Sequence, residues 1–431
     1  MLNRFFAIQA AGSSIRTEIV AGITTFLAMA YIMFVNPDIL AAAGMPRDSV
    51  FAATCIAAAI GSITMGLFAN YPIALAPGMG LNAYFAFEVC GRLGYSWQAA
   101  LAAVFLSGCL FVLVSLFRIR EWLVNAIPRS QKLAISAGIG LFLALIGMKN
   151  AGLVVAHPAT LLTVGNLHQP SVLLAFAGLM LIIALEYRRV TGGVIVGILL
   201  VTIASILLGL SSFVGVVAMP PSLAPTFLAM DFNAALQFGL LSVVMTFFLV
   251  EVFDATGTLV GVAHRAGLLD ADGKLPRVKR ALLADSTAIM AGAALGTSST
   301  TAYIESAAGT AVGGRTGLTA VVVGLLFLLA LFLSPLAASV PAFATAPALI
   351  YVAVLMARGL AELDWSDLTE SAPAVLCALS MPFLFSIAHG IAIGFISYAA
   401  IKTLAGRARD VSPVVWLVAV VFIAKFAFLQ A

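Results

Sequence analysis

The chain has 431 residues, of which 62% are hydrophobic and only 9% are charged, and its net charge is +4. A soluble globular protein carries about 25% charged residues, so this composition excludes a water-soluble protein and indicates a polytopic membrane protein. The basic residues are spread among short loops, which argues against a nucleic-acid-binding surface.

Apolar runs long enough to cross a bilayer, about 20 residues, recur along the whole chain. Two further runs, 73–89 and 298–312, are shorter and are interrupted by Gly, Pro, Ser or Thr. Together these runs predict an all-α membrane protein with about fourteen transmembrane segments. A last apolar run at 414–429 fits either one more span or a helix at the membrane interface, and the sequence leaves that choice open. Uninterrupted spans are expected at 18–36, 50–68, 97–118, 130–149, 171–187, 192–213, 236–260, 280–296, 316–336, 340–358, 372–386 and 388–404.

Lys and Arg are concentrated in alternate loops between these spans. The loops at 187–191 and 261–280 are examples, whereas the loops on the opposite side hold few basic residues. Because cytoplasmic loops carry the excess of positive charge, this pattern places the N-terminus, residues 1–17, in the cytoplasm.

Two halves of the chain resemble one another. Residues 90–106, "CGRLGYSWQAALAAVFL", are similar to residues 313–329, "GGRTGLTAVVVGLLFLL", and in this register the two interrupted segments coincide. Seven spans per half is an odd number, so the halves must cross the membrane in opposite directions. Inverted repeats with paired interrupted segments are typical of secondary transporters. We found no nucleophile–base pair that would indicate an enzyme.

Three carboxylates lie inside apolar segments, where a charge is costly and usually functional. Glu251 and Asp254 are three residues apart and share one helix face, and we expect one of them to hold a proton at neutral pH. The alternative is that one of them only caps a broken helix or pairs with a basic neighbour. The acids at loops and span ends, such as Glu18 and Glu186, are expected to be solvated.

Glu305 follows the run "GTSSTTAY", which favours extended backbone followed by a half-helix that starts near Glu305. The partner segment "APGMGLNAYF" offers Pro77 and Gly78 to interrupt the helix, and Asn82 falls opposite Glu305 in the repeat. Two half-helix ends and a carboxylate suit a flat ligand with both hydrogen-bond donors and acceptors. Asp285 is expected in the first turn of its helix, where the helix dipole would explain it.

Five stretches together resemble the AzgA-like purine permeases of the nucleobase–cation symporter-2 (nucleobase–ascorbate transporter) family. They are "GITTFLAMAYIMFVNPDIL", "APGMGLNAYF", "VEVFDATGTLVGVA", the long block 281–328 and "SIAHGIAIGFISY". The resemblance implies two inverted seven-span repeats, a core domain and a gate domain. The implied parts are core spans 1–4 at 18–118, gate spans 5–7 at 119–235, core spans 8–11 at 236–337, gate spans 12–14 at 338–404 and a C-terminal apolar segment at 405–431.

The resemblance also implies a function: import of adenine, guanine or hypoxanthine by proton symport across the bacterial inner membrane. The expected partners are a purine nucleobase and the lipid bilayer, a homodimer is compatible with the architecture, and no cofactor or metal is expected. An anion carrier or a uracil or xanthine carrier of the same architecture is the alternative, followed by a channel. Many relatives have Asp where this chain has Glu251. The resemblance implies Gly80, Asn82, Glu251 and Glu305 for substrate, with Asp254 as the second acid of the eighth-span motif. From the residues themselves we add Ser306 as a substrate donor, Glu251, Asp254 and Glu305 for the proton, and Phe26, Tyr84 and Phe253 for ring stacking.

Overall fold

The computed structural model describes residues 2–116, 127–235, 238–268 and 275–428. Helices make up most of this part of the chain, and two short two-stranded sheets and connecting loops complete it. Among the described residues, nine helices are long and apolar enough to cross a membrane, and three shorter apolar helices accompany them. The protein is therefore a mostly helical polytopic membrane protein, as its composition predicts.

One set of helices, the first helix group, comes from two stretches far apart in the sequence. The helices α15 and α4, α13 and α6, and α2 and α14 pack side by side in it. Its elements are α2 (Ile15–Met29), α3 (Ile32–Ala41), α4 (Arg47–Thr64), η1 (Met65–Ala69), β1 (Leu75–Pro77), α5 (Met79–Ala83), η2 (Tyr84–Arg92), α6 (Trp97–Leu116), α12 (Phe238–Arg265), α13 (Val278–Leu295), β4 (Thr300–Ala302), α14 (Ser306–Ala311) and α15 (Gly317–Ala330).

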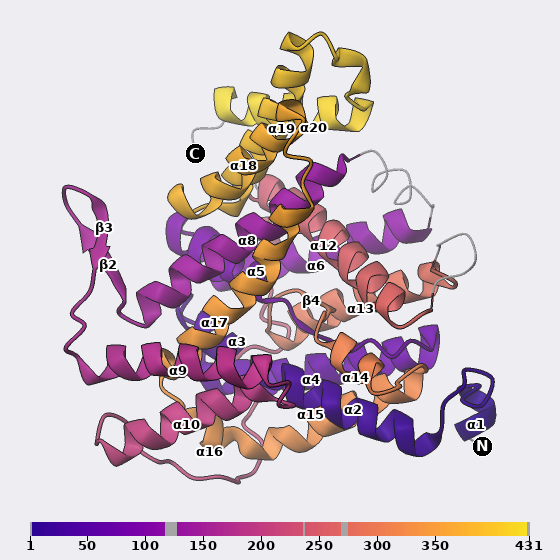
Figure 1. Cartoon of the computed structure of the whole chain (residues 1–431), viewed down its shortest axis with the longest axis vertical. Coiled ribbons are helices and arrows are strands. Elements are labelled where there is room, and N and C mark those ends of the chain that lie inside the picture. The colour runs from indigo at the N-terminus through magenta and orange to yellow at the C-terminus, as the bar shows by residue number, and fades with distance from the viewer. Residues whose placement is uncertain (1, 117–126, 236–237, 269–274, 429–431) are drawn as a thin grey trace.

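The second helix group is built in the same way from two other stretches. In it α8 packs against α17 and α18, α18 against α19, and α9 against α10 (Figure 1). Its elements are α8 (Arg129–Asn150), α9 (Pro170–Tyr187), α10 (Gly193–Leu207), α17 (Ala342–Ala357), η4 (Arg358–Glu362), α18 (Leu368–Phe383) and α19 (Ile387–Leu404). The two groups meet where α3 contacts α17, α5 contacts α8 and α2 contacts α10.

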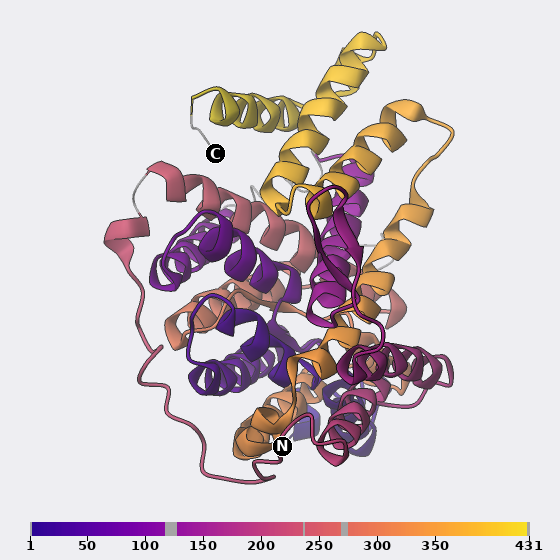
Figure 2. The same cartoon turned by 90° about the vertical axis from the view of Figure 1, so that its left-hand side faces the viewer.

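The remaining elements lie at the edges. A hairpin of β2 (Val154–His157) and β3 (Leu161–Val164) projects from the body of the molecule between α8 and α9 (Figure 1). Near the C-terminus, α20 packs against α19, at the opposite end of the molecule from the N-terminus in the view of Figure 2. The other short elements are α1 (Leu2–Phe5), α11 (Phe232–Ala235), η3 (Leu331–Leu333), α16 (Ser334–Ser339), η5 (Ala408–Asp410) and α20 (Pro413–Phe428).

Two expectations about individual acids are wrong. Glu18 is not solvated but fully buried, because its carboxylate accepts hydrogen bonds from the backbone N–H groups of Arg315 and Thr316 at 3.0 and 3.2 Å. Asp285 does not lie in a first turn, since α13 already begins at Val278. Both carboxylates instead hold distant parts of the chain together.

Candidate substrate site at the two interrupted segments

The two interrupted segments meet as an antiparallel pair of short strands inside the first helix group. β1 pairs with β4 so that Leu75 lies opposite Ala302 and Pro77 opposite Thr300. Beyond the pair, the N–H of Tyr303 donates to the carbonyl of Ala74 at 2.9 Å. Buried backbone without helical bonds is tolerated only when other groups satisfy it, and here each strand satisfies the other.

Each strand is followed at once by a short helix. α5 begins at Met79 after β1, and α14 begins at Ser306 after β4. The prediction of extended backbone followed by a half-helix near Glu305 is therefore confirmed. The first N–H groups of any helix lack intrahelical acceptors, but in α14 those of Ser306, Ala307 and Ala308 donate to preceding carbonyls, which leaves the start of α5 as the source of backbone donors here.

Glu305 is the residue immediately before α14, and its side chain is half-buried. Its carboxylate accepts a hydrogen bond of 2.5 Å from the hydroxyl of Tyr31. Tyr31 lies at the break between α2 and α3, a break that the apolar run 18–36 did not reveal. The only sequence signal for this partner is a phenol in an otherwise apolar segment. Glu305 keeps further acceptor capacity, because a carboxylate accepts about four hydrogen bonds.

Glu251 and Asp254 lie on α12, as predicted, but in different surroundings. Glu251 is fully buried, and the hydroxyl of Ser107 on α6 lies 3.0 and 3.1 Å from its two carboxylate oxygens. Asp254 is only half-buried and is close enough to Glu305 for the two charges to interact. Asp254 thus lies within interaction range of both Glu305 and Glu251, while Glu251 is also held by a hydroxyl of α6.

Asp285 supports β4 from the side of α13. This fully buried carboxylate accepts hydrogen bonds from the N–H of Ala302 at 3.0 Å and from the hydroxyl of Thr301 at 3.3 Å. Asp285 therefore fixes the strand that leads into Glu305. Sequence reasoning missed it because the acceptor role depends on a strand that packs across the helix 16 positions later.

Asn82 lies in the half-helix α5 and takes part in a buried network of side-chain hydrogen bonds. Its amide nitrogen donates to Asn36 at 2.6 Å, and Asn36 in turn donates to Thr54 at 2.7 Å and Thr297 at 2.9 Å. The side-chain carbonyl of Asn82 has no hydrogen-bond partner among the described residues. One acceptor of Asn82 is thus available, while its donor ties α5 to α3.

Gly80 and Ser306 hold the two half-helices in place. A Cβ added at Gly80 would come within 2.3 Å of Cγ2 of Ile139 on α8, so only glycine permits this approach between the helix groups. The hydroxyl of Ser306 accepts a hydrogen bond from the N–H of Ala74 at 3.0 Å, and its own N–H donates to Tyr303 at 3.2 Å. Both Ser306 groups are therefore occupied within the protein in this conformation.

The aromatic candidates pack against other rings. Tyr84 is buried and meets Phe247 edge to face, with ring centroids 4.9 Å apart. Phe26 meets Phe327 in the same manner at 5.1 Å. The side chain of Phe253 lies outside the described part of the chain.

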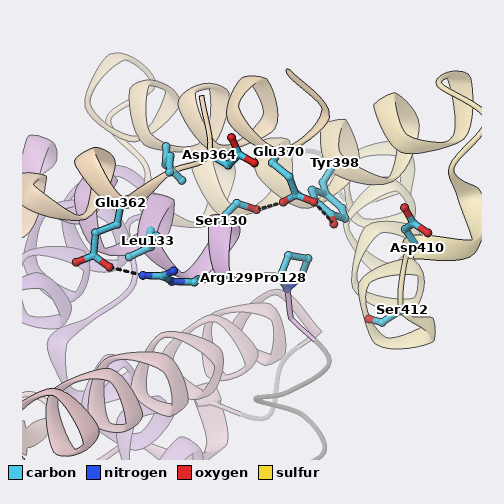
Figure 3. Close-up of a pocket in the computed structure, with 11 residues that line it drawn as sticks. Pro128, Arg129, Ser130, Leu133, Glu362, Asp364, Glu370, Tyr398, Asp410 and Ser412 are labelled. Atoms are coloured by element: carbon cyan, nitrogen blue, oxygen red, sulfur yellow. Dashed lines mark hydrogen bonds and ion pairs between the residues drawn. The ribbon is translucent and has the colours of Figure 1, made fainter. Parts of the chain in front are cut away.

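A separate cavity of about 480 Å³ lies in the second helix group, between α8, η4, α18 and the segment after α19 (Figure 3). Ser130 and Tyr398 donate to Glu370 at 2.5 and 3.0 Å, and Arg129 pairs with Glu362 at 2.5 Å. One ion pair and two hydrogen bonds between side chains of the second helix group line this cavity, and its lining residues do not include the strand pair.

The paired strands, the half-helix starts and the buried acids are those of a membrane transport protein rather than an enzyme. The family model Xan_ur_permease, described as "Permease family", matches residues 16–393. The chain therefore belongs to this permease family, and its resemblance to the AzgA-like purine permeases is confirmed.

Two relatives that are named as purine permeases match over the full length of the chain. The "Adenine permease AdeP" of Escherichia coli is 51% identical over 100% of this chain and 97% of its own length. The "Guanine/hypoxanthine permease PbuG" of Bacillus subtilis is 47% identical over 100% of both chains.

Solved structures share the fold at low sequence identity. The transmembrane domain of the cyanobacterium bicarbonate transporter BicA superposes with a TM-score of 0.66 at 15% identity, over 88% of this chain and 97% of that domain. SLC26A9 superposes with a TM-score of 0.65 at 10% identity, over 94% of this chain and 68% of that one. These likenesses concern the fold alone.

Proposed function

We propose that the protein imports purine nucleobases (adenine, guanine or hypoxanthine) by proton symport. The observation that carries the proposal is Glu305, a half-buried carboxylate placed by two crossed strands at the start of a half-helix. The names of the relatives, which are adenine and guanine/hypoxanthine permeases at 51% and 47% identity, support the purine class.

The proposed architecture has fourteen segments in two inverted seven-span repeats. The first helix group corresponds to the proposed core domain, residues 18–118 and 236–337, and the second group to the proposed gate domain, residues 119–235 and 338–404. The antiparallel pairing of β1 with β4 supports this arrangement, because one strand comes from each half of the chain. In transporters of this kind, one domain moves against the other around the substrate.

Recognition of a purine requires both acceptors and donors in one plane. Glu305 supplies an acceptor for the N–H groups of the ring, and the half-helix start near Gly80 supplies backbone donors, whereas the N–H of Ser306 would first have to leave the carbonyl of Tyr303. The free carbonyl of Asn82 adds a second acceptor. Tyr84, Phe26 and Phe253 remain candidates for stacking, which for the two described side chains would need movement away from their present ring partners.

Proton coupling is assigned to Glu251, Asp254 and Glu305. Asp254 is close enough to interact with both Glu251 and Glu305, and one proton held among the three acids would relieve the repulsion between like charges. The bound proton would neutralise one carboxylate, so the site could change from outward-facing to inward-facing without an unpaired buried charge. Two acids at the site also disfavour the alternative of an anion carrier.

The test is uptake of radiolabelled adenine, guanine, hypoxanthine, uracil and bicarbonate into bacteria that lack purine permeases, with and without a protonophore. We expect saturable purine uptake that collapses with the protonophore. Glu305→Gln should abolish uptake, whereas Glu362→Gln, which alters an exposed ion pair of the second group, should not. Uptake of uracil or bicarbonate without purine would establish the alternative carrier, and purine uptake that survives the protonophore would exclude proton coupling.

The proposed location is the bacterial plasma membrane with a cytoplasmic N-terminus, supported by the bacterial origin of the relatives and by the loop charges. A homodimer is also proposed, and its test is the mass of the detergent-solubilised protein.

A further inference from the structure

Glu88 is a fully buried carboxylate whose partners come mainly from the other helix group. It lies on η2 of the first group. Its oxygens accept a hydrogen bond from the hydroxyl of Ser386 and one of 2.8 Å from the N–H of Ile387, both at the start of α19 in the second group. One partner belongs to its own helix, Arg92, at 3.1 Å.

The start of α19 is suited to this contact. Ser386 is the N-cap of the helix, and its hydroxyl accepts from the N–H of His389 at 3.0 Å. A carboxylate at this end also meets the unpaired N–H groups and the positive end of the helix dipole. Arg92 extends the contact, since its guanidinium lies 3.3 Å from Nδ1 of His389.

An apolar contact accompanies the polar one. Phe385, in the turn before α19, has the left-handed backbone φ of 51° that is rare for such a residue. Its ring lies between Phe87 of η2, at 6.2 Å, and Phe142 of α8, at 5.1 Å. The turn is therefore docked against both helix groups at once.

We propose that these residues form a latch between core and gate that closes the outer side of the transporter and opens once in every cycle. The latch consists of Phe87, Glu88 and Arg92 on the core and Phe385, Ser386 and His389 on the gate. The inference rests on the proposed function, because it requires the two groups to move against each other. By the loop charges, the end of η2 and the start of α19 both face the outside.

The composition of the latch suits repeated opening. Separation of the groups removes the two bonds from Ser386 and Ile387, but Arg92 travels with Glu88 and keeps the carboxylate paired. A buried charge with no partner would be strongly unfavourable, so the ion pair within η2 makes the open state accessible. Ile139 lies one helical turn below Phe142 on α8 and is buried beneath the latch.

The first test locks the latch. In a variant without its four cysteines (Cys55, Cys90, Cys109 and Cys377), Glu88→Cys and Ser386→Cys are joined by a short bifunctional thiol reagent. Uptake of adenine should stop on cross-linking and return when a cleavable reagent is reduced. The matched control is Ser205→Cys with Ser211→Cys, two hydroxyls 2.7 Å apart within the gate, and uptake should persist there. Uptake at the full rate with the latch cross-linked would overturn the proposal.

The second test needs no transport. Ile139→Cys is labelled with a membrane-impermeant maleimide from outside, with and without Glu88→Gln. Loss of hydrogen bonds to a charged group should raise the labelling rate roughly tenfold, and an unchanged rate would contradict the latch. Faster labelling in a protein that takes up no purine would support the latch and refute the proposed substrate, so the two failures are distinguishable.

Discussion

Replacement of Asp285 tests whether this buried acid holds the strand that leads into the substrate site. Asp285→Ala removes the acceptor of two hydrogen bonds from β4, at 3.0 Å from the N–H of Ala302 and 3.3 Å from the hydroxyl of Thr301. A hydrogen bond to a charged group contributes about 1.5–3 kcal/mol, and an orphaned buried N–H adds its own penalty. We expect the free energy of unfolding to fall by about 3 kcal/mol.

Asp285→Asn keeps a side-chain oxygen that can accept a hydrogen bond but removes the carboxylate that can carry a charge. The amide oxygen still accepts from Ala302, so we expect a loss of about 1 kcal/mol and partial uptake. Asp48→Ala, at an exposed position in the first turn of α4, is the matched control and should behave like the wild type. The assay is thermal unfolding in detergent together with the KM for adenine. If Asp285→Ala unfolds at the wild-type temperature and keeps the wild-type KM, Asp285 does not position β4.

Three other changes follow from the described contacts. Tyr31→Phe removes the 2.5 Å bond to Glu305 and should raise the KM for adenine about tenfold while the protein still folds; an unchanged KM would separate this phenol from the site. Gly80→Ala forces a Cβ within 2.3 Å of Ile139 and should abolish uptake, with Ile139→Ala restoring part of it; failure of this rescue would point to another cause. Hydrogen bonds from neighbouring threonine and arginine side chains lower the pKa of Asp367, so its contribution to stability is present above the unfolded pKa of about 4 and is lost as pH falls below it. Asp367→Asn should therefore flatten the fall of Tm between about pH 4 and pH 3, and an equally steep fall would contradict this.

The interrupted segments were predictable because their signals are local. Pro77 and Gly78 cannot continue a helix comfortably, and the Ser/Thr run before Glu305 is a poor helix former. The strand pair itself, Leu75 to Pro77 with Thr300 to Ala302, could be anticipated only as two segments that coincide in the repeat.

Contacts between distant segments were not predictable from local pattern. The bond from Tyr31 to Glu305 joins residues 274 positions apart, and nothing in the run 18–36 marks a helix break. From sequence alone Glu18 is an acid at the end of a span and is expected to be solvated, but the turn at Arg315 buries it and donates a hydrogen bond to it. Glu88 gave no signal either, because its partners at Ser386 and Ile387 begin a helix almost 300 positions later.

Burial was the quantity that sequence reasoning estimated least well. Asp254 and Glu251 interact, as expected of two acids on one helix face, but their burial differs, since Glu251 is fully buried against Ser107 and Asp254 is half-buried. Helical spacing fixes which residues share a face, but which neighbour covers that face depends on packing between spans. The roles of the two acids stay predictions.

The most direct test of the central claim is equilibrium binding of adenine and guanine to the purified protein by calorimetry. It compares wild type with Glu305→Gln and, as control, Glu362→Gln. We predict saturable binding of a purine by the wild type and the control, and at least tenfold weaker binding by Glu305→Gln, as expected for loss of a charge-assisted hydrogen bond. Equal affinity in all three proteins would show that Glu305 does not contact the purine, and the substrate would then have to bind away from the two crossed strands.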